Sequence, residues 1–358
     1  MSGDNRRGRL MGRSGLAALG VALMAGASAL VGAPSAGQAQ EVTLKVHHFL
    51  PPPSTTHRLF IEPWAKRLET QSNGRIKVEI YPAMQLGGKP PQLFDQVRDG
   101  IADVVWTLPG YTRGRFPVIE AFELPFMIST AEATSQAVQE YYETYAREEF
   151  SSIHPLMFHV HARGVIHTRE KPITSLSDFK GLKLRAPTRL ITSMVEALGA
   201  TAVGMPVPAV PQALSKGVVD GTVIPWEVTV PLKVYELTKY HTTFDGPRGF
   251  YTSIFLFGMN KNTYEGMSDD LKKVIDDNSG LALAKEIGAL FDQVEQPGID
   301  KATERGNEIF VLSPTAAEEW RKQTSGVADR WAADMDSKGK DGKALVKAAR
   351  DLVAKYSD

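Results

Sequence analysis

The segment Asp178–Pro187 (DFKGLKLRAP) contains Arg185, the residue with the clearest chemical potential in the chain. A polar turn at Gly181 and a short strand ending before Pro187 would place Arg185 at the end of that strand. A guanidinium group is a planar, permanently charged fork that binds a carboxylate through two parallel hydrogen bonds. Arg185 is therefore a candidate anchor for an organic anion, although a surface arginine on an edge strand fits the same residues.

Further polar and aromatic side chains follow the first and third predicted strands. His48 and Ser54 lie where the first strand gives way to a helix, and Trp106 and Tyr111 lie at and after the end of the third. Ligands of open parallel sheets bind at the carboxyl ends of the strands. We therefore expect these four residues to contact a ligand, with capping and core packing as the competing roles.

A second group of candidates follows the strand that ends at Pro225. This proline should direct Trp226 and Glu227 into the space between two lobes, where Glu227 could accept a proton from a ligand hydroxyl or hold a cation, or remain an ordinary solvated carboxylate. Tyr251 is expected where the chain crosses back to the first lobe, and hinge residues often touch ligand. His167 is a further candidate for ligand contact.

Signatures of catalysis and cofactor binding are scarce. The chain has no His-Glu-x-x-His, Gly-x-Ser-x-Gly or Walker sequence. Strand histidines such as His159 and His161 are more often structural than metal ligands. The sequence predicts a protein that is not an enzyme and uses no cofactor or metal; a hydrolase or lyase using Glu227 with His48 or His167, and a purely structural exported protein, remain as alternatives.

The first 39 residues are typical of a secretory signal peptide. Arginines at 6, 7, 9 and 13 precede an apolar run over 15–31, and small residues over 37–39 suit cleavage near Ala39. The chain has no cysteine, which excludes disulfides and a lipid-bearing cysteine, and its 41 basic and 41 acidic residues give no footprint for nucleic acid. We expect a periplasmic protein that does not itself span the membrane.

Strand and helix patterns alternate through most of the chain. Strands are predicted over 42–49, 76–80 and 102–107, with helices between them, and the alternation repeats after Arg185 with helices over 190–198 and 208–216 and strands over 202–205 and 218–224. A strand follows over 253–259, and the remainder is predicted to be helical. This order indicates an α/β fold with parallel sheets, and the length of 358 residues suits two lobes.

In this order, several short motifs resemble those of the solute-binding proteins of tripartite ATP-independent periplasmic (TRAP) transporters, the dicarboxylate-binding (DctP) family. The resemblance covers nearly the whole chain after the signal peptide. Besides the Arg185 segment, its motifs are Ser72–Pro82 (SNGRIKVEIYP), Gln85–Gly87 (QLG), Val97–Gly100 (VRDG), Leu124–Phe126 (LPF) and Ala213–Gly221 (ALSKGVVDG).

The resemblance implies a two-lobe periplasmic binding protein of type II-like fold. Each lobe would be a sheet flanked by helices, with crossing hinge strands and a long C-terminal helix; lobe I would comprise 40–162 plus 250–292, and lobe II 163–249 plus 293–358. Arg185 matches the family's carboxylate-binding arginine. The implied partners are a small organic anion and the small and large membrane subunits of an ion-gradient-driven transporter.

The chain departs from the polar pockets of the sialic-acid and dicarboxylate branches. Ile224 stands where those branches place an asparagine, and Val165 stands near the position of a second arginine, with Arg163 out of phase. The resemblance therefore favours an aromatic or hydroxylated monocarboxylate, the hydroxyl group being bound by Glu227. A uronate or a 2-oxo acid is the alternative ligand.

Overall fold

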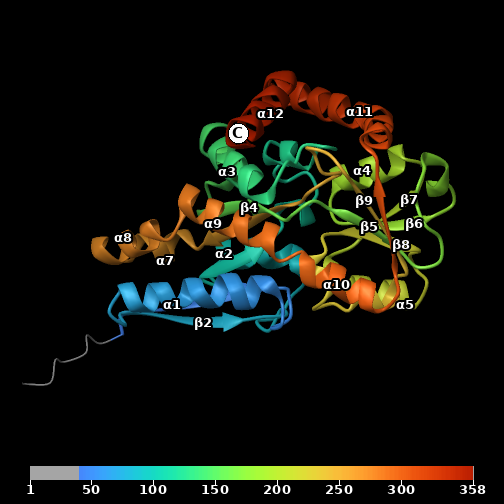
Figure 1. Ribbon diagram of the computed structural model, residues 1–358. Helices are drawn as coiled ribbons and strands as arrows, with labels where there is room; N and C mark the ends of the chain where they lie inside the picture. The colour runs from blue at the N-terminus through green and yellow to red at the C-terminus, as the bar shows by residue number, and fades with distance from the viewer. Residues whose placement is uncertain (1–39, 358) are drawn as a thin grey trace, which may run out of the picture. The chain divides into compact units, whose positions relative to one another are not determined.

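The computed structural model describes residues 40–357, whose strands form two sheets (Figure 1). The predicted signal peptide lies outside these residues. The first sheet has the order β2-β1-β3-β10-β4, in which β1 runs parallel to β2 and β3 while β10 runs antiparallel to β3 and β4. Its strands are β1 (Val42–His48), β2 (Ile76–Tyr81), β3 (Val104–Thr107), β4 (His154–Val160) and β10 (Ile254–Met259).

The second sheet has the order β11-β9-β5-β8-β6-β7. Strand β6 runs parallel to its neighbours β7 and β8, whereas β5 runs antiparallel to β8 and β9. Its strands are β5 (Val165–Thr168), β6 (Lys183–Ala186), β7 (Thr201–Gly204), β8 (Gly221–Ile224), β9 (Tyr240–Phe244) and β11 (Glu308–Leu312).

Two sequence expectations about these sheets were wrong. The sheets are mixed rather than purely parallel, because β5 and β10 enter their sheets after the chain has crossed from the other one. The region after Met259 is not wholly helical, because β11 adds to the edge of the second sheet beside β9. Strand β11 is only partly buried, so its sequence lacks the strong apolar alternation of a core strand.

Helices flank both sheets. A side chain caps α3 at its start, where Thr130 accepts a hydrogen bond from the Ala133 amide at 3.0 Å. The helices are α1 (Glu62–Gln71), α2 (Leu93–Arg98), α3 (Ala131–Tyr141), α4 (Arg189–Ala197), α5 (Val210–Ser215), α6 (Val234–Leu237), α7 (Lys261–Glu265), α8 (Asp269–Asp277), α9 (Gly280–Gln293), α10 (Gln296–Glu304), α11 (Pro314–Ser337) and α12 (Gly342–Ser357). None of them is long and apolar enough to cross a membrane.

The C-terminal helices contact elements associated with both sheets. Helix α11 packs on α4 and α12 packs on α3, as the red ribbon in Figure 1 shows. Trp320 is buried against Phe179 and Phe244 of the second sheet's core, while the indole of Trp331 donates to the Pro117 carbonyl at 3.1 Å. The lobe boundaries stay a prediction, and these contacts place the C-terminal segment against both cores.

Two crossing segments connect the sheets and bond to each other. One joins β4 to β5 and contains His161 and Gly164; the other joins β9 to β10 and contains Tyr251 and Thr252. The Gly164 amide donates to the Tyr251 carbonyl at 2.9 Å, and the Thr252 hydroxyl donates to the His161 carbonyl at 2.8 Å. A Cβ atom on Gly164 would lie 1.9 Å from the Tyr251 ring, so the ring occupies the space that a side chain would need.

Candidate ligand-binding site

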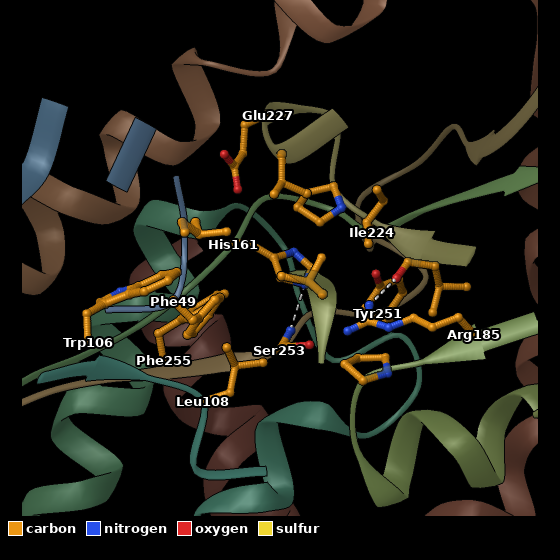
Figure 2. Close-up of a pocket in the computed structure, with 16 residues that line it drawn as sticks. Phe49, Trp106, Leu108, His161, Arg185, Ile224, Glu227, Tyr251, Ser253 and Phe255 are labelled. Atoms are coloured by element: carbon orange, nitrogen blue, oxygen red, sulfur yellow. Dashed lines mark hydrogen bonds between the residues drawn. The ribbon is translucent and has the colours of Figure 1, made fainter. Parts of the chain in front are cut away.

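A cavity of about 40 Å³ is lined by residues at the ends of strands from both sheets and by residues of the crossing segments. This volume is well below the range of about 300–1,000 Å³ found for small-molecule sites. Figure 2 shows Arg185 pointing in from one side and Glu227 from above, with Phe49, Trp106 and Phe255 on the side away from Arg185.

Arg185 is held inside the protein without a carboxylate partner. It lies in β6, between β7 and β8, and is 2% exposed, which excludes the surface arginine on an edge strand. Its Nε donates to the Met205 carbonyl at 2.9 Å and its Nη1 to the Val223 carbonyl at 3.2 Å, while Nη2 has no partner among the described residues.

The electrostatics of Arg185 favour an anionic ligand. Burial lowers the pKa of its guanidinium group, yet arginine keeps its proton in proteins. No side chain between residues 40 and 357 forms an ion pair with it; Tyr111 and Tyr251 lie nearby and raise its pKa, but they supply no carboxylate. A buried, unpaired charge is costly, and a carboxylate on Nη2 would supply both the missing charge and the missing hydrogen bond.

Glu227 is the second charged side chain in the cavity lining. It follows β8 and Pro225, is 6% exposed, and its Oε2 atom has no hydrogen-bond partner among the described residues. Burial raises the pKa of Glu227 to about 8; the nearby Glu295 carboxylate adds to this rise and the Thr55 hydroxyl opposes it. The carboxyl group is therefore largely neutral at pH 7 and can both donate and accept a hydrogen bond.

Aromatic rings form an apolar wall of the cavity. Trp106 stacks on Phe255 with ring centroids 4.5 Å apart, and Phe49 lies 4.8 Å from Trp106. The Trp106 indole donates to His159 Nε2 at 2.8 Å, so its polar atom is already satisfied by the protein. The ring faces can therefore pack against a flat apolar ligand without leaving a polar group unpaired.

The crossing segments contribute the remaining wall. His161 Nε2 accepts from the Ser253 amide at 3.0 Å, and its Nδ1 bonds to the Ala162 carbonyl. Burial lowers the pKa of His161 to about 4, so its ring is neutral with both nitrogens occupied. Tyr251 lines the cavity on the same side, so the segments that connect the two sheets also supply residues of the cavity lining.

His48 and Ser54 lie outside the cavity lining. His48 Nε2 bonds to His57 Nδ1 at 3.0 Å, and its Nδ1 accepts from the Leu50 amide at 3.3 Å. Ser54 accepts from the His57 amide at 3.3 Å through its hydroxyl group. Both side chains are buried and hydrogen-bonded within the protein, His48 at the end of β1 and Ser54 just before the helical segment that begins at Thr56.

Trp226 and His167 also lie outside the lining, in a buried cluster behind the second sheet. The Trp226 ring packs on His167 and His241 at centroid distances of 4.9 and 4.7 Å. His167 Nδ1 bonds to His241 Nδ1 at 2.6 Å and its Nε2 to the Ile224 carbonyl at 3.2 Å. The chain turns sharply after Pro225, so that Glu227 faces the cavity while Trp226 faces away from it.

Tyr111 lies beside the anchor but lines a neighbouring cavity with Arg113 and Gly204. Its hydroxyl accepts from the Val207 amide at 3.0 Å, and the charge of Arg185 partly offsets the rise that burial causes in the pKa of Tyr111. Tyr111 thus connects a loop after β3 to the short helix η8 (Val207–Ala209) of the second sheet.

The two positions that depart from polar branches of the family behave differently. Ile224 lines the cavity as an apolar residue, and Val165, its partner across β5 and β8, does not line it. Arg163 is also outside the lining, and its guanidinium group donates to the carbonyls of Ser129, Gly246 and Pro247.

Several lining residues were not singled out from the sequence. Phe49 ends the first predicted strand and Phe255 lies within another, so alternation alone gave no reason to separate them from core residues. The position of Phe49 at the carboxyl end of a predicted strand, where ligands bind in open parallel sheets, was the sequence feature that could have identified it. The remaining such residues include Leu108, Val207, Val223, Val228 and Ser253, whereas His161 had been considered only as a metal ligand.

Comparison with known proteins places the chain in a family. The family model described as "Bacterial extracellular solute-binding protein, family 7" (DctP) matches residues 46–334. A TRAP solute binding protein from a marine metagenome, specific for aromatic acid ligands and solved with metahydroxyphenylacetate, is 54% identical, with a TM-score of 0.88 over 89% of this chain and 100% of that one.

Two further structures are similar. A TRAP solute binding protein from Rhodoferax ferrireducens, with copurified benzoate, is 46% identical, with a TM-score of 0.87 over 88% of this chain and 98% of that one. A Bordetella bronchiseptica protein with bound (R)- and (S)-mandelate is 27% identical, with a TM-score of 0.80 over 87% and 99%.

The chain therefore belongs to family 7 of the bacterial extracellular solute-binding proteins, the DctP family of TRAP transporters. It is a solute-binding protein and not an enzyme, and its α/β architecture with two flanked sheets and a long C-terminal helix is that of the family.

Proposed function

We propose that this protein binds an aromatic monocarboxylate and delivers it to the membrane subunits of a TRAP transporter. The observation that carries the proposal is the buried Arg185, whose unpartnered Nη2 faces a small cavity walled by Phe49, Trp106 and Phe255. A carboxylate would pair with the guanidinium group while its aromatic ring packs against the wall.

The cavity is better suited to this ligand class than to the alternatives. Among residues 40–357, Arg185 is the only permanently cationic residue of the lining, so a second carboxylate would have no cation to pair with. A uronate or a short 2-oxo acid would leave hydroxyl groups, or empty space, against the aromatic wall. The aromatic acids held by the similar proteins from the marine metagenome and Rhodoferax ferrireducens support the same choice.

The cellular setting follows from the family. Relatives named as periplasmic binding proteins include the ectoine-binding proteins of Ruegeria pomeroyi and Halomonas elongata. On this basis the protein acts in the periplasm, after residues 1–39 have been removed as a signal peptide near Ala39. Its macromolecular partners are the small and large membrane subunits, and transport is driven by an ion gradient.

A ligand screen tests the proposal. Purified protein is mixed with benzoate, 3-hydroxybenzoate, mandelate, succinate, glucuronate or pyruvate, and its thermal unfolding is measured with each compound. Every compound that stabilises the protein is then titrated by calorimetry. Ligand at a hundred times its dissociation constant stabilises the protein by about 2.7 kcal/mol, which is readily measured. Stabilisation by the aromatic acids alone supports the proposal, and stabilisation by glucuronate or pyruvate but no aromatic acid would contradict it.

A further inference from the structure

Two buried polar atoms in the cavity lining lack a partner, and the aromatic acid proposed above satisfies only one of them. Arg185 Nη2 is matched by the ligand carboxylate, while Glu227 Oε2 is left without a hydrogen bond. Leaving a buried polar atom without a partner destabilises a protein, so such an atom in a binding cavity favours a ligand group that can hydrogen-bond to it. Figure 2 shows the Glu227 carboxyl group directed into the space that Arg185 also faces.

The surroundings of Glu227 determine which ligand group can bind there. The Trp226 and Glu227 amides donate to the Glu295 carboxylate at 3.0 and 2.9 Å, which fixes the turn that presents Glu227. Burial raises the pKa of Glu227 to about 8 and that of Glu295 to about 8, and a hydrogen bond from the Thr55 hydroxyl to the Glu227 carboxyl group opposes the first of these rises. No cation faces Glu227 from these elements, so its carboxyl group is available as a neutral donor and acceptor.

We propose, on the basis of the proposed function, that Glu227 hydrogen-bonds a hydroxyl group on the ligand's ring. The preferred ligands are therefore hydroxylated aromatic monocarboxylates with the hydroxyl at a ring position remote from the carboxylate, meta or para. An ortho hydroxyl is excluded because it bonds to its own carboxylate. A second carboxylate is excluded because it would face Glu227 with no cation to pair with.

The proposal assigns the two ends of the ligand to two chemically different side chains. Arg185 binds the anionic end, and Glu227 selects among ligands that share that end. A site built to hydrogen-bond a ligand hydroxyl discriminates against the analogue that lacks it, because the analogue leaves the protein group unpaired. Glu227 is thus a specificity-determining residue, and Arg185 supplies affinity common to the whole class.

The experiment is calorimetric titration of wild-type protein, Glu227→Leu and Glu227→Gln with benzoate and with its 2-, 3- and 4-hydroxy derivatives. The measured quantity is the ratio of the benzoate Kd to that of each derivative. In the wild type we expect the 3- or the 4-hydroxy derivative to bind about tenfold tighter than benzoate, the value of one good hydrogen bond. Glu227→Leu should reduce this ratio to about one, and Glu227→Gln, which keeps a donor and an acceptor, should retain most of it.

Two controls separate this result from a folding defect. Thermal unfolding without ligand should show Glu227→Leu at least as stable as the wild type, because an unpaired buried carboxyl group has been removed. Glu170→Leu removes a carboxylate that is 85% exposed and should keep the wild-type ratio.

Failure of this inference differs from failure of the proposed function. If no aromatic acid binds the wild type, the proposed function itself is wrong. If benzoate binds but no hydroxyl derivative binds more tightly, or if Glu227→Leu keeps the preference, Glu227 does not select the hydroxyl group while the aromatic-acid assignment stands. A preference for the 2-hydroxy derivative would likewise overturn the inference.

Discussion

Arg185 and Arg189 lie four residues apart on either side of the junction between β6 and α4, and their guanidinium groups have opposite surroundings. Arg189 is 28% exposed at its side chain and binds two carboxylates, Glu120 at 2.5 Å and Asp334 at 3.1 Å. Arg185 is 2% exposed, donates to two backbone carbonyls, lies beside the Tyr111 hydroxyl and has no carboxylate partner among residues 40–357. The accessible arginine has carboxyl partners within the protein, whereas the inaccessible one has none among residues 40–357.

The difference separates a structural role from a binding role. Arg189 joins α4 to the short helix η4 (Ile119–Glu123) and to α11, so its ion pairs connect parts of the chain that are far apart in sequence. Arg185 connects neighbouring strands of one sheet and keeps one donor unused. A charged group whose hydrogen bonds are complete stabilises the fold, and one whose hydrogen bonds are incomplete is available to a ligand.

The largest expected effect is the loss of ligand binding in Arg185→Met. Removing the guanidinium group leaves the ligand carboxylate buried and unpaired, at a cost of about 3–5 kcal/mol, so the Kd for benzoate should rise at least a hundredfold. The ligand-free protein should not lose stability, because an unpaired buried charge has been replaced by an apolar side chain. Calorimetric titration and thermal unfolding measure the two quantities, and near wild-type affinity in a folded variant would end the role of Arg185 as anchor.

Arg189→Met should show the reverse pattern, with a smaller effect. Glu120 is 4% exposed and would lose a hydrogen-bond donor, and Asp334 would lose a cation, but Arg189 itself is partly solvated, so the free energy of unfolding should fall by about 1–3 kcal/mol. Urea unfolding without ligand measures this change, and the Kd for benzoate should change less than tenfold. Equal losses of affinity in Arg185→Met and Arg189→Met would break the comparison, because both arginines would then belong to the site.

Replacement by lysine sharpens the comparison. A lysine keeps the charge but lacks the planar fork, so Arg185→Lys should weaken benzoate binding by about tenfold. Arg189→Lys should lower the free energy of unfolding by less than about 1 kcal/mol, since an ammonium group can still reach a carboxylate. The same two measurements apply, and a larger loss of affinity in Arg189→Lys than in Arg185→Lys would contradict the assignment of roles.

The smallest expected effect concerns pH and the carboxyl group of Glu120. Burial raises the pKa of Glu120 to about 8; Arg189 opposes this rise, and Glu123 and Glu149 add to it. Because the folded state binds this proton more tightly than the unfolded chain, the contribution of Glu120 to stability is complete below about pH 4.5 and is lost as the pH rises to about 8. Urea unfolding at pH 5 and pH 8 should show a smaller decrease in Glu120→Gln than in the wild type, and an equal decrease would exclude Glu120 as a source of the pH dependence.

The sequence alone does not distinguish these two arginines. The partners of Arg189 lie 69 and 145 residues away, and the absence of a partner for Arg185 is equally a property of the folded chain. The strand and the proline break around Arg185 could be predicted locally, and the order of family motifs supplied its expected role. The binding role of Arg185 and the structural role of Arg189 differ in whether each guanidinium group finds partners within the protein, and this depends on tertiary contacts.

The same limit applies to the fold and to the rest of the site. Strands β1, β2 and β10 and helix α4 have strong periodic patterns and were predicted close to their observed bounds. Strands β5 and β9 were not predicted, because each has four or five residues with polar histidine and threonine among them. Glu227 was found through Pro225, whereas Phe255 reaches the cavity only because β10 pairs between β3 and β4.

The close approach of Tyr251 to Gly164 has a consequence for variation in the family. With the aromatic ring in place, any side chain at 164 would collide with it, and the amide-to-carbonyl bond between the two residues prevents the backbone from moving apart freely. The two positions should therefore change together in evolution: relatives that keep a bulky ring at 251 should keep glycine at 164, and those with a larger residue at 164 should have a small one at 251.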